Sequence, residues 1–341
     1  MSDDLDPMTD DDVAALLAID ALEADEQADA ELRLGPWPAE LSSAALPLAE
    51  SLAAEPPADL RDAVLATALA RRPAGRPLDA PESVTPVDAF GRTIDDLHTL
   101  LTSLSNDEWD TVAHDEHGRV RDLVAHLSGV ERLNARWLDP DDEVPYLPDH
   151  VASTQPVVAA LAEAEPADVL REWEDAARAM LDEARVHDGT DQVTFHDITV
   201  SVDGLLTMRT FELWAHGMDI ALATGRPLPM LDDARMQLMS SRLVSAVAGA
   251  LAYRGATSPG RAARFVLTGP AGGCYDVALD VAAPPTHAEL ADPDVTIVAD
   301  VLDLCRVAAA RLTPEELSYT VYGDPALAGL VLANIDAFAR D

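Results

Sequence analysis

One stretch near the middle of the chain limits the fold more than any other. Residues 209–226 read RTFELWAHGMDIALATGR, a run of mostly good helix formers that a Gly-Arg-Pro sequence closes. On such a helix Glu212 and His216 lie one turn apart and share a face. Burying a carboxylate and an imidazole between packed helices costs free energy unless something binds them. The stretch therefore predicts a helical bundle in which a partner group or ion binds these two side chains.

Length and charge narrow the class of protein. The chain has 341 residues, 48% of them hydrophobic, which predicts two or three domains with sizeable cores. The sequence contains no run of about eighteen apolar residues, so we expect no membrane-spanning helix. Its start lacks the basic region followed by an apolar region that marks a secretory signal, so we expect a cytoplasmic protein. The formal net charge of -39 disfavours direct binding of DNA or RNA, because phosphates require cationic partners. An acidic surface serves solubility or attracts a basic partner protein.

Composition and the positions of proline- and glycine-rich stretches divide the chain into three predicted segments. Residues 1–78 form an acidic helical segment, in which the helices 13–22 and 59–71 are too short to bury a core alone. The second segment, 84–230, has long apolar stripes at helical spacing and predicts a four-helix bundle. Its helices are expected at 86–104, 120–138, 166–186 and 203–226.

The last segment, 231–341, changes from helical to alternating periodicity and predicts a small α+β domain. Its helices are expected at 232–251, 301–311 and 325–338, and its strands at 264–269, 275–281, 295–298 and 318–322. The predicted fold class is therefore mainly α, with a bundle, a small C-terminal α+β domain and a short helical N-terminal segment.

A third candidate residue lies on the second bundle helix. His126 is next to the apolar stripe of that helix, where a lone histidine is more often a hydrogen-bonded core residue than a ligand. Together with Glu212 and His216, however, two imidazoles and one carboxylate from two helices make a three-ligand metal site with an open position. A divalent cation would offset the burial of the carboxylate and keep both histidines neutral. Without a metal, Glu212 needs a buried arginine or several hydrogen bonds.

These residues carry a family resemblance. The runs VRDLVAHL at 120–127 and FELWAHGMDIALATGR at 211–226 resemble the mycothiol-dependent maleylpyruvate isomerase family. Its members combine a DinB-like four-helix bundle with a small α+β domain related to sterol carrier proteins. The stretch from 299 to 328 is similar to the closing segment of the family. One departure is Gly118-Arg119, where many members carry a tryptophan, and it affects the substrate pocket rather than the ligands.

The resemblance implies a function. His126, Glu212 and His216 would bind a divalent metal, which the family suggests is zinc, although the residue types suit nickel, iron or manganese nearly as well. The cofactor would be mycothiol, whose thiolate adds to a double bond, allows rotation and leaves. The chain would then be an isomerase or S-transferase acting on a small organic acid or electrophile. Arg306 is the candidate for gripping substrate carboxylates, with Arg311 as the second choice; the alternative is an exposed arginine on the helix 301–311.

Other titratable residues are assigned lesser roles. Asp219 follows His216 by three residues and is either an acceptor for its imidazole or an ordinary solvent-facing aspartate. His98 is not expected to be a ligand, because a fourth ligand would close the site. The two cysteines, Cys274 and Cys305, are expected to be buried, reduced and structural. The remaining histidines lie in polar or turn-like contexts and are expected to be solvated: His114, His117, His150, His187, His196 and His287.

The N-terminal segment supports a rival function. Its helical pattern is similar to the N-terminal domain of actinobacterial anti-sigma factors, which embraces a basic sigma-factor surface. The zinc-binding subset of those domains carries a histidine and two cysteines that residues 1–78 lack, so the likeness is to the metal-free type. In this alternative, residues 1–78 bind a sigma factor, and the metal-binding domain is sensory or regulatory.

Overall fold

The computed structural model describes residues 83–139, 150–195, 198–281 and 293–337, together with Val13, Ala30 and Arg33. It divides into two compact units, Met1–Ala68 and Leu69–Asp341, and the account that follows concerns the second. The predicted N-terminal helical segment, with its proposed sigma-factor surface, lies outside the described residues. The division of the rest at residue 230 stays a prediction.

Four long helices form the predicted bundle, and the mainly α fold class is confirmed. Helix α6 packs against α8, while α5 packs against both α8 and α9. The bounds of these helices are Pro86–Thr102 (α5), Val120–Leu138 (α6), Pro166–Ala184 (α8) and Val202–Thr224 (α9). Their positions agree with the predicted helices to within a few residues at each end.

Local capping chemistry sets two of the helix ends. The Thr85 hydroxyl accepts a hydrogen bond of 3.1 Å from the backbone N–H of Asp88, and Pro86 follows at the first helical position of α5. Helix α9 ends at Gly225, whose φ of 67° is the left-handed conformation that glycine adopts without steric cost. The Gly-Arg-Pro stop of the sequence therefore acts as predicted.

The connections of the bundle contain a helix, a 3-10 turn at Asn106–Asp110 and two hairpins, none of which was predicted from the sequence. Helix α7, His150–Leu161, packs against α6. A short hairpin precedes α6, in which β1, Val112–His114, pairs antiparallel with β2, Gly118–Arg119. A second hairpin pairs β3, Gln192–Phe195, with β4, Ile198–Ser201, before α9 begins.

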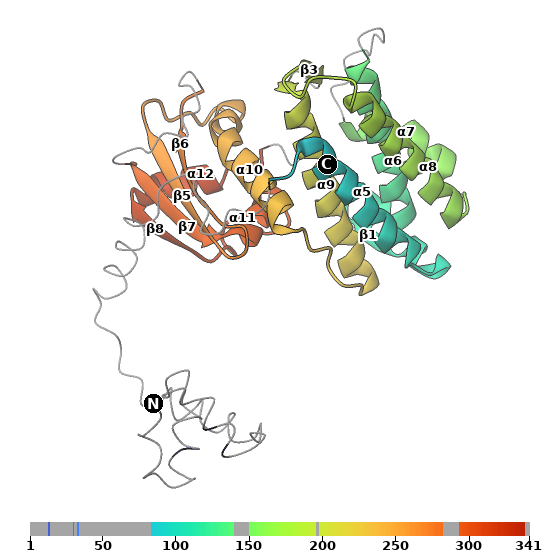
Figure 1. Ribbon diagram of the computed structural model, residues 1–341, viewed down its shortest axis with the longest axis horizontal. Helices are drawn as coiled ribbons and strands as arrows, with labels where there is room; N and C mark the ends of the chain where they lie inside the picture. Colours follow the sequence, from blue (N-terminus) through green and yellow to red (C-terminus); the bar gives the residue numbers. More distant parts are fainter. Residues whose placement is uncertain are drawn as a thin grey trace. The chain divides into compact units, whose positions relative to one another are not determined.

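The C-terminal part is a four-stranded sheet with three helices, which confirms the predicted α+β arrangement. The strand order is β6-β5-β7-β8; β5 and β7 run parallel, and the two outer strands pair antiparallel with them. Helix α10 packs against both α9 and α11, so it lies between the sheet and the bundle (Figure 1). The bounds are Asp233–Tyr253 (α10), Ala262–Thr268 (β5), Cys274–Ala278 (β6), Val295–Asp300 (β7), Val301–Ala308 (α11), Tyr319–Gly323 (β8) and Pro325–Leu332 (α12).

Helix α9 belongs to two hydrophobic cores at once. Leu206 and Leu213 pack into the core of the bundle, whereas Trp214 and Met218 pack into the core formed with α10 and the sheet. This double burial explains why the stretch is apolar around most of its circumference, since a helix covered on both sides has no large solvent-facing stripe. Polar side chains on α9 therefore lie between the core of the bundle and the core formed with α10 and the sheet.

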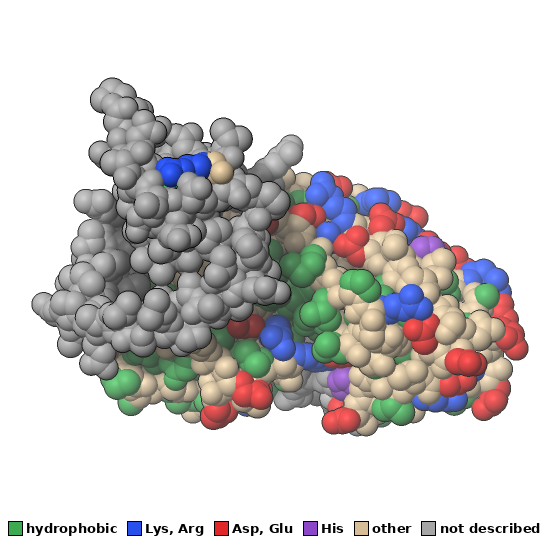
Figure 2. Space-filling view, turned by 90° about the horizontal axis from the view of Figure 1, so that it is seen from below, with side chains coloured by type: hydrophobic (Ala, Val, Ile, Leu, Met, Phe, Trp, Pro, Cys, Tyr) green, Lys and Arg blue, Asp and Glu red, His purple; other side chains and the backbone are tan. Residues whose placement is uncertain are grey.

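Two further observations concern the surface. Acidic side chains are spread over the face seen in Figure 2, with arginines interspersed among them rather than gathered into a basic patch. Among the helices of the described ranges, none combines the length and apolarity that crossing a bilayer requires.

Candidate metal centre

Three buried imidazoles form the centre of the candidate site. His117, His126 and His216 each offer a ring nitrogen, and these nitrogens lie within 4.8 Å of one another. The rings of His117 and His126 are stacked with their centroids 3.9 Å apart, and the ring of His216 meets that of His126 edge-on at 6.3 Å. The structure therefore brings together the two histidines that the sequence predicted, His126 and His216, and adds a third.

The burial of His117 corrects the sequence analysis. Only 7% of its surface is exposed, so the expectation that this side chain is solvated is wrong. His117 lies in the turn between β1 and β2, just before Gly118, whose φ of 79° folds the chain back over α6. The hairpin closes when the Val120 N–H donates to the Thr111 carbonyl at 2.9 Å. The signal that could have identified it is the His-Asp-Glu-His spacing of residues 114–117 immediately before a glycine.

Helix α7 fixes the orientation of the His126 ring. His126 Nδ1 lies 2.7 Å from Thr154 Oγ1, and the Thr154 hydroxyl donates its own proton to the Val151 carbonyl at 2.9 Å. The hydroxyl must therefore accept a proton from Nδ1, which leaves Nε2 of His126 as the nitrogen with a lone pair. Close packing makes this contact: a Cβ on Gly129 would lie 2.9 Å from the Cβ of Thr154, so glycine lets α7 approach α6.

A carboxylate holds His216 in the same tautomer. His216 Nδ1 lies 3.1 Å from Asp219 Oδ2, and Arg311 donates two hydrogen bonds to the two oxygens of that carboxylate, at 2.7 and 3.2 Å. Arg311 Nη2 also lies 3.2 Å from Nδ1, but its shorter bond, at 2.7 Å, is to the carboxylate. We assign the proton to Nδ1 because an ionised carboxylate can only accept, and Nε2 of His216 is then the lone-pair nitrogen.

The ionisation of Asp219 follows from these bonds. Burial alone would raise the pKa of Asp219, but the hydrogen bonds from His216 and Arg311 and the charge of Arg311 hold it below its ordinary value. The acceptor role predicted for Asp219 is confirmed, and the alternative of a solvent-facing aspartate is wrong, since its side chain is only 10% exposed. His114 lies near these residues as well. Its ring nitrogen forms a second group of potential metal ligands with His216 and Asp219.

Glu212 lies one turn before His216 on α9 and is held by a buried arginine. Arg209 donates to the carboxylate of Glu212 and, at 2.7 Å, to Glu131 on α6. The side chains of Arg209 and Glu131 are 3% and 0% exposed, and that of Glu212 is 28% exposed. Although burial opposes its charge, the two carboxylates raise the pKa of Arg209, so it stays protonated. Burial raises the pKa of Glu131, whereas the charge of Arg209 and its hydrogen bond lower it. When both carboxylates are ionised, the three groups carry a formal charge of minus one, which attracts a cation. The role of Glu212 as a metal ligand stays a prediction.

The donor set fits a divalent metal. In a tetrahedral zinc site with bonds of about 2.0–2.1 Å, neighbouring nitrogens lie about 3.4 Å apart. The ring nitrogens of the cluster lie within 4.8 Å of one another, so they would have to move closer together to bind one ion. Because both His126 and His216 donate Nδ1–H to an oxygen acceptor, they have the arrangement that metal-ligating histidines adopt.

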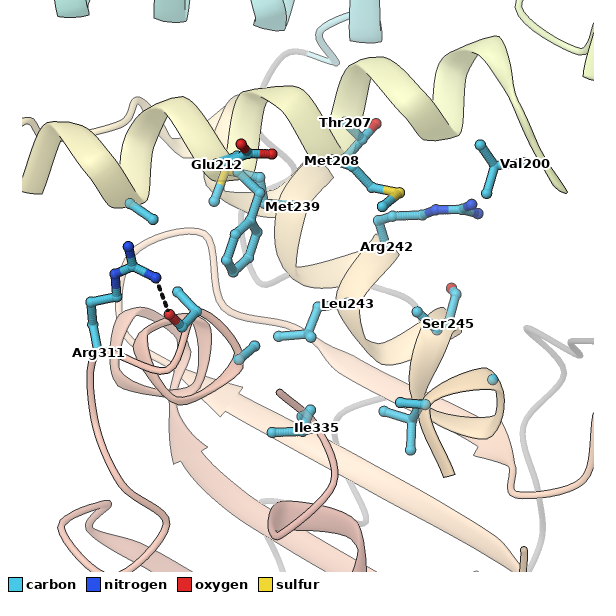
Figure 3. Close-up of a pocket in the computed structure, with 18 of the residues that line it drawn as sticks. Val200, Thr207, Met208, Glu212, Met239, Arg242, Leu243, Ser245, Arg311 and Ile335 are labelled. Carbon is cyan, nitrogen blue, oxygen red and sulfur yellow. Dashed lines mark hydrogen bonds between the residues drawn. The ribbon is translucent and has the colours of Figure 1, made fainter. Parts of the chain in front are cut away.

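A pocket of about 320 Å³ opens beside the cluster. Glu212 and His216 from α9 line it, together with Arg311, Arg242 from α10 and a mostly apolar wall (Figure 3). Arg311 reaches this pocket because α11 ends at Ala308 and Ala310 then adopts a positive φ of 57°, so the chain turns away from the helix axis. The predicted continuation of the helix to residue 311 is therefore wrong.

The other predicted residues lie apart from the cluster. Arg306 pairs with Asp303 on its own helix at 3.1 Å and does not line the pocket, so its substrate-binding role stays a prediction. His98 pairs with Glu174 at 3.1 Å and lies outside both groups of potential ligands found among the described residues. Cys274 and Cys305 are buried and unbridged, as predicted.

Comparisons with known proteins found one matching family model and two similar solved structures. Residues 90–221 match the family model described as the mycothiol maleylpyruvate isomerase N-terminal domain. No curated protein sequence matches the chain. Two solved structures are similar to it: the mycothiol-dependent maleylpyruvate isomerase and a histidine-to-alanine variant of it, at 16% and 15% sequence identity and TM-scores of 0.47 and 0.48. Each comparison covers 69% of this chain and 91% of the solved chain.

The matched range contains α6 and nearly all of α9, and with them His117, His126, Glu212 and His216. Residues 90–221 are therefore similar to the N-terminal domain of the mycothiol-dependent maleylpyruvate isomerase family.

Proposed function

We propose that the chain binds a divalent metal ion through His126 and His216 and uses mycothiol to isomerise, or transfer a thiol to, a small organic acid or related electrophile. The observation that carries the proposal is the pair of Nδ1 contacts, to Thr154 at 2.7 Å and to Asp219 at 3.1 Å. These contacts assign the lone pair of each imidazole to Nε2, in a cluster that two packed helices hold in place. Zinc is the metal that the resemblance to the family favours.

The third ligand comes from one of two residues beside this pair. Glu212 is the ligand implied by the family motif; it lies on the same face of α9 as His216 and lines the same pocket. Its carboxylate would have to turn away from Arg209, which keeps Glu131 as a partner. His117 already has a ring nitrogen within the cluster. We propose Glu212 as the third protein ligand and His117 as an additional donor.

The chemistry suits a thiol cofactor. When bound, a divalent metal lowers the pKa of a thiol at its open position and keeps it as the nucleophilic thiolate. The chain supplies no thiol of its own, because Cys274 and Cys305 are buried in the C-terminal core and neither lines the pocket. Apolar side chains of α9 and α10 exclude water from most of the pocket wall, while Arg311 places a cation beside His216.

The test uses the protein loaded with cobalt in place of zinc, because cobalt reports its ligands by absorption. Adding mycothiol should produce a sulfur-to-cobalt charge-transfer band in the native protein and none in His126→Ala. His187→Ala, which changes a histidine of the α8 end, is the matched control and should behave as the native protein. The zinc-loaded protein should then turn over an electrophilic organic acid only when mycothiol is present, and His126→Ala should show no such turnover. A cobalt spectrum that mycothiol leaves unchanged would overturn the proposal.

The anti-sigma alternative concerns residues 1–78 and so lies outside the described part of the chain. The features of the described residues support the metal and thiol function, and we propose no second function.

A further inference from the structure

Arg242 on α10 differs from the other arginines of the pocket region. Arg311 bonds Asp219, and Arg209 bonds Glu131 and Glu212. Within the described ranges, by contrast, Arg242 has no hydrogen bond and no carboxylate oxygen within 4.0 Å of its guanidinium. This is unexpected in a chain with 62 acidic and 23 basic residues. An arginine stays charged in proteins, so the pocket contains a cation whose charge no side chain of the described residues neutralises.

The position of this guanidinium is defined by packing. Figure 3 shows the Arg242 side chain extended from α10 toward Val200, at the end of the pocket opposite Arg311. Its Nη2 atom lies only 2.7 Å from the place that a Cβ on Gly204 would occupy, so the guanidinium rests against the bare backbone of α9. Arg242 is an exposed residue, yet the protein atoms around it lower the pKa of its guanidinium by partial desolvation.

The pocket between the two ends is long and mostly apolar. Gly204 and His216 are twelve residues apart on α9, which corresponds to about 18 Å along the helix axis. The wall between them is formed by Met208, Phe211, Met239 and Leu243. A small diacid could not reach both ends, whereas an elongated molecule with an apolar body could.

We propose that the Arg242 end of the pocket binds the carboxylate of an elongated, largely apolar organic acid whose opposite end lies at His216. A guanidinium fork pairs with a carboxylate through two parallel hydrogen bonds, and partial desolvation strengthens such bonds. The apolar wall would cover the body of the ligand. This assignment names the substrate class and rests on the proposed function only for the reacting end at His216.

The test measures binding of sodium decanoate and of 1-decanol, an uncharged molecule of the same length, by calorimetry. The native protein should prefer decanoate, and Arg242→Gln should weaken decanoate binding about tenfold to a hundredfold while leaving decanol unchanged. Arg254→Gln, at the end of the same helix and paired with Asp336, is the matched control and should change neither. Gly204→Ala, which displaces the guanidinium, should also weaken decanoate binding.

Circular dichroism checks that each variant is folded, and Arg242→Lys, which keeps the charge without the fork, should retain part of the preference. The same titrations on chelator-treated protein separate this proposal from the metal site, because the preference for decanoate should persist without metal. Equal binding of decanoate and decanol to the native protein, no binding of either, or an unchanged preference in Arg242→Gln would overturn the assignment.

Discussion

The imidazole of His216 and the carboxylate of Asp219 are joined by a contact of 3.1 Å between Nδ1 and Oδ2, and both residues lie on α9. Arg311, which follows α11, completes the arrangement from the C-terminal part of the chain by bonding the same carboxylate. The orientation of one candidate metal ligand in the bundle therefore depends on a residue more than ninety positions away. Residues of both parts contribute to one site.

Removing the Asp219 carboxylate should weaken metal binding without unfolding the protein. In Asp219→Ala, the His216 ring loses the acceptor that fixes its tautomer, and we expect a loss of about 10–100-fold in zinc affinity. Competition with a chromophoric chelator measures this affinity. Asp303→Ala, which removes an exposed carboxylate paired with Arg306 on α11, is the control and should retain native affinity. Native affinity in Asp219→Ala would contradict the role assigned to this carboxylate.

Two variants separate the roles of Glu212 and His117. If both donate to the metal, Glu212→Gln and His117→Asn should each lower zinc affinity by at least about tenfold, and the absorption bands of the cobalt-loaded protein should shift in each. The double variant shows whether the two losses are coupled. A cobalt spectrum that Glu212→Gln leaves unchanged would remove Glu212 from the ligand set. The same result for His117→Asn would make His117 a packing residue that covers His126.

The buried ion pair between Arg209 and Glu131 should be costly to break. Glu131→Ala leaves the guanidinium of Arg209 with Glu212 alone, and the loss of one partner of a buried pair typically costs about 3–5 kcal/mol of unfolding free energy. Urea denaturation measures this loss. The control is Arg132→Ala, at the residue that follows Glu131 on α6. The Arg132 side chain is 55% exposed and paired with Glu172, so this substitution should lower the free energy of unfolding by less than about 1 kcal/mol. If both substitutions lowered the free energy of unfolding by the same amount, the prediction that the buried pair is the more costly one to break would be wrong.

The cysteines should be unreactive in the folded protein. Burial, together with the charge of Asp300, raises the pKa of Cys305 to about 12 from an ordinary value of 9.0. Ellman's reagent at pH 8 should therefore release almost no colour in minutes from the native protein and two equivalents in urea. Because the unfolded chain releases the Cys305 proton near pH 9 and the folded chain keeps it to about pH 12, stability should fall across that interval. Fast reaction of one thiol in the native protein would contradict this account.

The fold could be predicted largely from the sequence because its signals are local. Proline and threonine at the start of α5, glycine at the end of α9 and the apolar stripes between them act within a few residues of one another. Helix α7 has no comparable signal, since it carries Pro156 in its interior and little separation of polar and apolar faces. Its position depends on packing against α6, where Gly129 makes room for Thr154.

The site was only partly predictable for a similar reason. His126 and His216 could be identified because they share helix faces with apolar residues, and Asp219 because it lies within one turn of His216. His117 could not, and Arg311 was only the second choice for binding a substrate carboxylate, since each is placed by a positive φ, at Gly118 and at Ala310, which turns the chain toward the cluster. The buried arginine that Glu212 requires in the absence of a metal is also present, in Arg209, three residues before it.

The most direct test of the central claim is the metal content of the purified protein. After zinc loading and dialysis against buffer without chelator, elemental analysis should find about one zinc ion per chain in the native protein. His126→Ala and His216→Ala should each lose that ion while their helical circular dichroism is retained. A native protein without bound metal, or stoichiometric zinc in either variant, would contradict the account.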